Sequence, residues 1–303
     1  CGAQVEGDGL GSERLRFAPG ARPQPGTYRF DVAAAREGGS AGAAMLVAQS
    51  ILLPLALAAG ESDVRIAGGT HVQWSPSFDF ARDSWLPALK RMGVAAGLEL
   101  IGWGFYPAGG GEVRLSVRGM GAATGQAQPR LEAVSLVERG RLLRVTGRAV
   151  AANLPAHIAQ RMADRARARL AESGIASDIL ALRVRAVSPG AGIFLCAESE
   201  AVSAGFGALG ERRKPAEAVA EEAAEALLAY LASGAAIERH LADQLVLPCV
   251  LADGVSVYTA ERITPHLTTG AWVAERFGLA SFRIEGAEGG PGTVTITPAA
   301  TPA

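Results

Sequence analysis

The sequence has few cysteines, and they are not arranged in pairs. The three are Cys1, Cys196 and Cys249, an odd number with wide spacing. Disulfide frameworks and structural zinc sites use paired cysteines at short, regular spacings. The pattern therefore argues against both and indicates a reducing compartment, so we expect a cytoplasmic protein.

A long apolar run and an excess of one charge are also absent. The longest apolar run, residues 43–59, is interrupted by Gln49, Ser50 and Pro54. A membrane span needs about 20 apolar residues, so we expect a buried helix here and no membrane partner. The net charge of −1 gives no basic surface for a long nucleic acid, but a protein that grips only a strand end does not need one.

The apolar residues that are present suffice for a large core. Hydrophobic residues make up 49% of the 303 residues, a length typical of about two domains. Helical and strand patterns alternate without the regular period of a doubly wound sheet, which predicts an α+β fold. Residues 15–17 and 28–32 alternate in polarity and predict a hairpin.

A composition shift at residues 121–129, rich in Gly, Ala, Gln and Pro, marks a boundary. We predict a large domain whose first part is 1–130, a small inserted α/β domain at 131–235, and the second part of the large domain at 236–303. A helix expected in the small domain carries four arginines, Arg161, Arg165, Arg167 and Arg169. They could contact RNA phosphates or form a solvated, charged helix face.

Two of the four histidines lie within residues 240–270. Pro265 indicates the first turn of a helix, which would hold the His266 ring beside unpaired backbone N–H groups. Imidazole is largely neutral near pH 7, so a ring nitrogen can attack phosphorus. We predict that His266 accepts a nucleotidyl group and that residues 240–244 hold the nucleotide; the alternative is a capping or core histidine.

Two further features allow a functional or a structural interpretation. The Gly68-Gly69-Thr70-His71 run after a predicted strand, followed by aromatic residues, indicates the rim of a site. Gln49 is a single amide in an apolar helix and is either a ligand contact or a satisfied core amide.

Five stretches together resemble the RNA 3′-terminal phosphate cyclase family in order and spacing. They are Gly11-Ser12-Glu13-Arg14-Leu15, Gly68-Gly69-Thr70, Gly104-Phe105-Tyr106-Pro107-Ala108-Gly109-Gly110-Gly111, Leu241-Ala242-Asp243-Gln244-Leu245 and His266-Leu267-Thr268-Thr269. The resemblance implies a large domain of repeated units, each a small sheet on two helices, with a smaller α/β domain inserted.

The resemblance also implies a reaction. ATP adenylates an active-site histidine, AMP passes to the 3′-phosphate of an RNA 3′ end, and the neighbouring 2′-hydroxyl attacks to give a 2′,3′-cyclic phosphate. A divalent metal, Mg or Mn, assists. The nucleophile falls on His266. The positions implied to bind ATP are Gln49, Pro76, Phe80, His240, Leu241, Ala242, Asp243 and Gln244.

Some positions depart from the family pattern. His240 replaces a tyrosine expected to stack on adenine, and an imidazole offers less area, so we expect weaker ATP binding. Gly270 replaces an asparagine near the nucleophile. A Glu-Gly-Gly-Gly-Gln stretch and arginines, expected to bind metal and phosphates, would precede Cys1, so we expect that about one repeat unit is missing.

These departures keep other interpretations open. The chain could be a non-catalytic, cyclase-like RNA-processing scaffold, or a truncated and inactive cyclase. An enolpyruvyl-transferase-like enzyme would share the repeated architecture but would leave the histidine motif without a purpose. The sequence predicts neither the metal ligands nor the oligomeric state.

Overall fold

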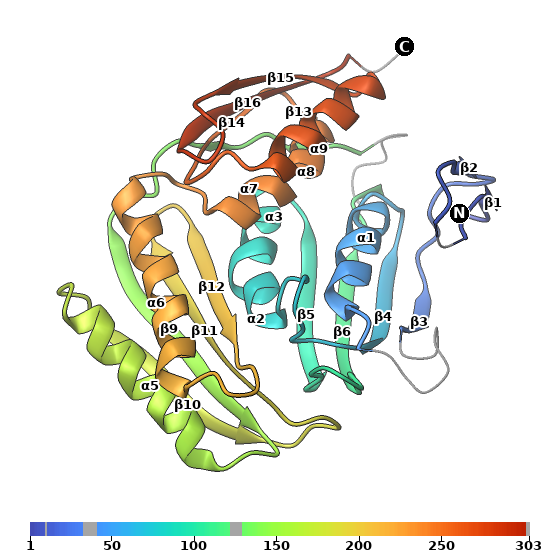
Figure 1. Cartoon of the computed structure of the whole chain (residues 1–303). Coiled ribbons are helices and arrows are strands. Elements are labelled where there is room, and N and C mark those ends of the chain that lie inside the picture. The colour runs from blue at the N-terminus through green and yellow to red at the C-terminus, as the bar shows by residue number, and fades with distance from the viewer. Residues whose placement is uncertain (10, 33–40, 122–128, 301–303) are drawn as a thin grey trace.

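The computed structural model describes residues 1–9, 11–32, 41–121 and 129–300. Within them the chain forms three four-stranded sheets with helices packed against them (Figure 1). A small antiparallel pair, β1 (Gln4–Glu6) and β2 (Arg16–Ala18), lies to one side. The expected hairpin between residues 15–17 and 28–32 is therefore wrong, because β2 pairs with β1.

The first unit is a four-stranded sheet covered by helices. Its elements are β3 (Thr27–Asp31), α1 (Ala44–Ala56), β4 (Glu61–Gly68), the continuous helix α2 (Phe78–Phe80), η2 (Ala81–Trp85) and α3 (Leu86–Arg91), and then β5 (Ala95–Gly102) and β6 (Gly111–Arg118). The strand order is β3-β4-β6-β5, with β3 and β4 parallel and the other pairs antiparallel. Strand β6 buries Val113, Leu115 and Val117 at alternate positions, as a half-buried strand requires.

The second unit repeats this topology. Its elements are β8 (Ser135–Leu136), α7 (Arg239–Gln244), α8 (Val246–Val250), β14 (Ser256–Ala260), α9 (Pro265–Arg276), β15 (Ala280–Glu285) and β16 (Gly292–Pro298). The order β8-β14-β16-β15 again begins with a parallel pair followed by antiparallel pairs. The expected α+β fold with repeated sheet units is confirmed.

A short sequence repeat accompanies the structural one. The two copies are Leu53-Pro54-Leu55-Ala56-Leu57-Ala58-Ala59-Gly60 and Leu247-Pro248-Cys249-Val250-Leu251-Ala252-Asp253-Gly254. Each copy ends the first helical segment of its unit and leads to the following strand. Gly60 and Gly254 adopt similar positive φ angles of 134° and 122°, which favour glycine.

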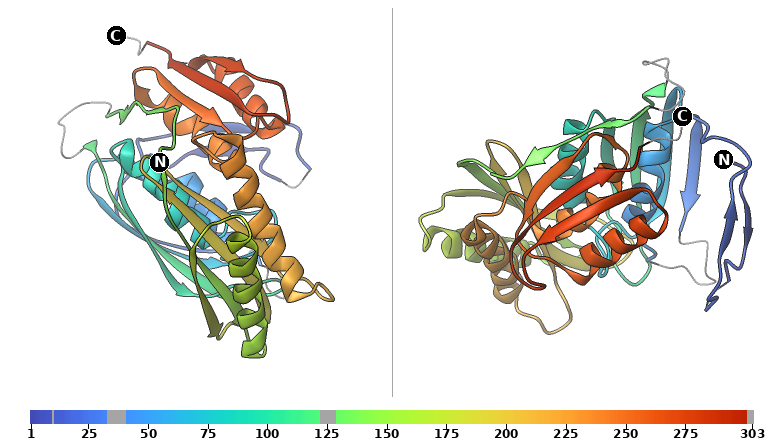
Figure 2. Two further views of the ribbon diagram at one scale, coloured as in Figure 1. Left: turned by 90° about the vertical axis from the view of Figure 1, so that its left-hand side faces the viewer. Right: turned by 90° about the horizontal axis from the view of Figure 1, so that it is seen from above.

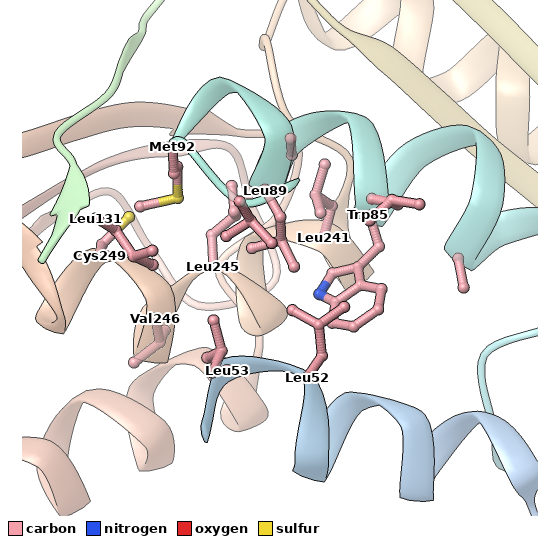
Figure 3. Packing of buried hydrophobic residues seen from close by; sticks show 14 of the residues in the cluster. Leu52, Leu53, Trp85, Leu89, Met92, Leu131, Leu241, Leu245, Val246 and Cys249 are labelled. Carbon is pink, nitrogen blue, oxygen red and sulfur yellow. The ribbon is translucent and has the colours of Figure 1, made fainter. Parts of the chain in front are cut away.

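The helices of the two units face each other across one hydrophobic core (Figure 3). Leu52 of α1 and Trp85 of η2 approach Leu241 and Leu245, which lie on α7 and at its C-terminal end. All four side chains are at most 5% exposed. Burial of such a side chain contributes about 1.5–3 kcal/mol, so this core fixes how α7 lies against the first unit.

The third sheet belongs to the inserted segment. It consists of β9 (Leu142–Ala152), α5 (Ala156–Ala171), β10 (Ser177–Val184), β11 (Gly190–Ser199), β12 (Ser203–Leu209) and α6 (Ala216–Ser233). The strand order is β10-β9-β11-β12, and α5 and α6 cover one face around a separate core (Figure 2).

The start of this sheet differs from the sequence-based boundary. Strand β7 (Leu131–Glu132) pairs with β13 (Ala252–Asp253), and β8 pairs with β14. Residues 131–136, which the composition shift places in the small domain, therefore pair with the second unit. The division into domains otherwise stays a prediction.

The arginines of α5 are engaged with acids. Three of them pair with glutamates of α6 at successive helix turns: Arg161 with Glu217, Arg165 with Glu221, and Arg169 with Glu225. Arg167 pairs with Asp164. These pairings favour a charged helix face over an RNA contact.

In the part of the chain that the structure describes, no helix combines the length and apolarity needed to cross a membrane.

Candidate active site

His266 is exposed in the first turn of α9. Thr264 caps this helix, because its Oγ1 accepts a hydrogen bond from the Leu267 N–H at 3.0 Å, and Pro265 occupies the first turn. Helix N-termini carry unpaired N–H groups and the positive end of the helix dipole. The imidazole therefore stands where a negatively charged phosphate is favoured.

A second hydrogen bond of Thr264 attaches this turn to α7. The Thr264 hydroxyl donates to Asp243 Oδ1 at 2.5 Å. Burial raises the pKa of Asp243, while the bond from Thr264 and the charge of His266 act to lower it. One hydroxyl thus both caps α9 and fixes it to Asp243.

Glu238 organises the start of α7. Its side chain is 1% exposed and accepts hydrogen bonds from the backbone N–H groups of His240, at 2.8 Å, and Leu241. Burial raises the pKa of Glu238 to about 8, although the two N–H groups favour the ionised form. This cap fixes the first turn of α7 and therefore the direction in which the His240 side chain points from the helix.

His240 is exposed in the first turn of α7. Desolvation by the surrounding protein, and then the charges of Arg239 and His266, lower its pKa to about 4. Its Nε2 accepts a hydrogen bond from Arg239 Nε at 3.3 Å, which fits an unprotonated nitrogen. A neutral ring can stack on a base without carrying charge into the contact.

The amide of Gln244 joins α7 to the first unit. Gln49 Nε2 on α1 donates to Gln244 Oε1 at 2.7 Å across 195 positions of sequence. Both residues are half-buried. Each amide retains a polar group that could bind a ligand, so the structural and functional interpretations of Gln49 are compatible.

The remaining predicted contacts are placed differently. Leu241 and Ala242 lie in the core at 1% and 0% exposure, and the Ala242 carbonyl accepts from Tyr258 Oη at 2.8 Å. Their side chains therefore shape α7 and are not presented to a nucleotide. Pro76 and Phe80 are half-buried, and Phe80 packs against Gly205 on β12. Among the described residues, no hydrogen bond or ring stacking joins either one to His240.

The expected rim at residues 68–80 is largely sealed. His71 is 1% exposed; its Nδ1 lies 2.8 Å from Thr70 Oγ1 and its Nε2 lies 2.8 Å from Asp79 Oδ2. Arg148 of β9 pairs with Asp79, and the imidazole stacks on Trp103 with ring centroids 4.5 Å apart. This group joins the first unit to the third sheet and offers no access to substrate. Local sequence patterns could not reveal it, because Arg148 is 69 positions from Asp79.

Comparison with known proteins places the whole chain in one family. The RNA 3′-terminal phosphate cyclase family model matches residues 1–284. A protein of that name from Methylococcus capsulatus is 55% identical over 296 residues, which are 98% of this chain and 80% of the relative. Its namesakes from Nostoc punctiforme and Salmonella enteritidis are 48% and 41% identical, covering 95% and 96% of this chain and 80% of each relative. The chain therefore belongs to the RNA 3′-terminal phosphate cyclase family.

Proposed function

We propose that this protein converts an RNA 3′-phosphate to a 2′,3′-cyclic phosphate with ATP, through a covalent His266–AMP intermediate. The observation that carries the proposal is the Asp243–Thr264 hydrogen bond. It holds the turn that bears His266 against the helix that bears His240, Asp243 and Gln244.

The proposed chemistry assigns a step to each of these side chains. A nitrogen of the His266 ring attacks the α-phosphorus of ATP, a P–N bond forms, and pyrophosphate leaves. The 3′-phosphate of RNA then takes the AMP group and frees the imidazole. Attack of the 2′-hydroxyl on the activated phosphorus closes the cyclic phosphate and releases AMP. A covalent intermediate divides one difficult displacement into easier steps.

The surrounding residues have distinct proposed roles. His240 stacks on adenine as a neutral ring, and the carboxylate of Asp243 and the amide of Gln244 hydrogen-bond the nucleoside. The N–H groups of the first turn of α9 offset the charge on the α-phosphate. We assign Pro76 and Phe80 to the far side of the base, as the family resemblance implies.

A divalent metal ion, Mg²⁺ or Mn²⁺, is expected to assist this reaction. The described residues contain no group of three or more His, Cys, Asp or Glu side chains that could hold a metal ion. The donors seen here therefore do not fit a metal site of their own.

The three cysteines are consistent with the cytoplasmic location that we infer. All are free thiols, and burial raises the pKa of both Cys196 and Cys249 to about 12. Thiols with such pKa values are poor nucleophiles, so they do not compete with His266.

The test is the covalent adduct itself. The protein is incubated with α-labelled ATP and Mg²⁺ or Mn²⁺, and acid-labile label on the protein is measured. We expect the label to be lost in His266→Ala and kept in His157→Ala, an exposed histidine on α5. An equally labelled His266→Ala rejects the mechanism, and so does an unlabelled parent protein once the expected preceding repeat unit is restored. RNA binding without any adduct in the protein with that unit restored would support the scaffold function instead.

A further inference from the structure

Two adjoining loops carry an exposed aromatic ring and two arginines that form no ion pair within the described residues. We call this surface the Trp74 patch; it consists of Trp74, between β4 and α2, and Arg212 and Arg213, between β12 and α6. Trp74 is 96% exposed, the highest value among the exposed large hydrophobic side chains of the described chain. Both arginines are exposed, and neither takes part in a side-chain hydrogen bond or an ion pair within the described residues.

One hydrogen bond brings the two loops together. Gln73 Nε2 donates to Glu211 Oε1 at 2.8 Å, across 138 positions of sequence. Gln73 precedes Trp74 and Glu211 precedes Arg212 in the chain. The contact therefore places Trp74 and Arg212 each one residue away from a hydrogen bond that joins the two loops.

The backbone shows that this arrangement is imposed by the fold. Three non-glycine residues of the described chain have positive φ angles, and two of them are Trp74, at 62°, and Arg213, at 73°. The left-handed conformation is unfavourable for bulky side chains and persists where the surroundings hold it, often at binding sites. A fully exposed indole gains no burial energy that would offset this cost.

The patch differs from the other arginine-rich surface of the molecule. On α5, Arg161, Arg165 and Arg169 each face a glutamate of α6. In the part of the chain that the structure describes, Arg212 and Arg213 form no ion pair of this kind, and Lys214 beside them pairs with Glu222. Unpaired guanidinium groups next to an open indole match a chain of phosphates that carries planar bases.

We propose that the Trp74 patch binds single-stranded RNA upstream of the 3′ end. A base stacks on the indole of Trp74, and neighbouring phosphates bind Arg212 and Arg213. The identity of the strand rests on the proposed function, but the contact itself requires neither ATP nor His266. The patch would keep the RNA on the protein while its end is activated.

The experiment measures binding of a fluorescein-labelled RNA with a 3′-phosphate, about twelve nucleotides long, by anisotropy and without ATP. Stacking predicts that Trp74→Ala weakens binding about 5- to 150-fold. Removal of both guanidinium groups, Arg212→Ala with Arg213→Ala, should flatten the plot of log K against log salt by about 1.4. Phe17→Ala, at an aromatic residue 59% exposed on β2, is the matched control and should bind like the parent.

Competition with polyphosphate distinguishes RNA binding from the binding of any polyanion. Polyphosphate has no bases, so its affinity should fall in the double arginine variant and stay unchanged in Trp74→Ala. A parent protein that does not bind the RNA, or a Trp74→Ala variant that binds it equally well, overturns the proposal. Equal loss of RNA and polyphosphate binding in Trp74→Ala also overturns it, because stacking would then not be the cause.

The outcome is independent of the adenylation test. We expect Trp74→Ala to form the protein–AMP adduct like the parent, since that step uses no RNA. If Trp74→Ala forms the adduct normally and binds RNA like the parent, the proposed RNA contact is refuted and the adenylation mechanism is not. An adduct that survives in His266→Ala refutes the mechanism alone and leaves the RNA contact standing.

Discussion

The hydroxyl of Thr264 should affect both the stability and the activity of the candidate active site. It accepts the Leu267 N–H as the cap of α9 and donates to Asp243 on α7. Thr264→Val keeps the shape but removes both hydrogen bonds. Thr264→Ser keeps the oxygen and loses only a methyl group, so it is the matched control.

The structure sets the size of the effect. Loss of an N-cap oxygen costs about 1 kcal/mol. A hydrogen bond to a charged group contributes about 1.5–3 kcal/mol, and the lower part of that range applies because Asp243 is only half-buried. We therefore expect Thr264→Val to lower the free energy of unfolding by about 2–3 kcal/mol, and Thr264→Ser by less than about 1 kcal/mol.

Three assays report on the two hydrogen bonds of the Thr264 side chain. Urea unfolding gives the stability, and hydrogen exchange at the Leu267 amide reports the cap itself. The protein–AMP adduct should form about 10- to 100-fold more slowly in Thr264→Val, because the His266 turn is no longer held beside the nucleotide segment. If Thr264→Val and Thr264→Ser were equally stable, equally protected at Leu267 and equally active, the reasoning about this hydroxyl would be refuted.

Two further predictions concern the same region. Gly270→Ala should stabilise the protein by about 0.5–1 kcal/mol in urea unfolding, because Gly270 lies inside α9 and an added Cβ would meet Val246 at ordinary contact distances of 3.7–4.0 Å; a loss of stability would show that the site is already full. Glu238 has a folded-state pKa raised to about 8 by burial, above its unfolded value, so its contribution to stability is complete below the unfolded pKa and is lost as pH rises through about 8. Between about pH 5 and 9 the parent should therefore lose more unfolding free energy than Glu238→Gln, and parallel curves would contradict this account.

Local sequence patterns predicted the elements of the fold better than their partners. The Thr-Pro-His run predicted the beginning of α9, which starts at Pro265. The predicted hairpin failed because polarity alternation identifies strands but not pairing: Thr27 of β3 lies opposite Asp63 of β4 in a parallel register. The strands at residues 131–136 were assigned to the wrong unit for the same reason, since their partners follow about 120 residues later.

The candidate site shows the same limit. His240, Asp243 and Gln244 could be singled out as polar residues of one segment, but Leu241 and Ala242 turn their side chains into the core. A helical wheel alone could not decide this, because α7 has only six residues. The sequence could not single out Trp74 as exposed, because nearby aromatic residues such as His71 and Phe78 are buried.

The repeat of topology explains why the site was hard to see in the sequence. Each unit contributes its first helix, and the hydrogen bond between Gln49 and Gln244 joins α1 to α7 where the two units face each other. His266 follows the second strand of the second unit, so its turn reaches the same place only when β14 is paired within its sheet. Neither unit contains the site alone. Substitutions in the shared core between Leu52 and Leu241 should therefore impair adduct formation by separating the units before they unfold the chain.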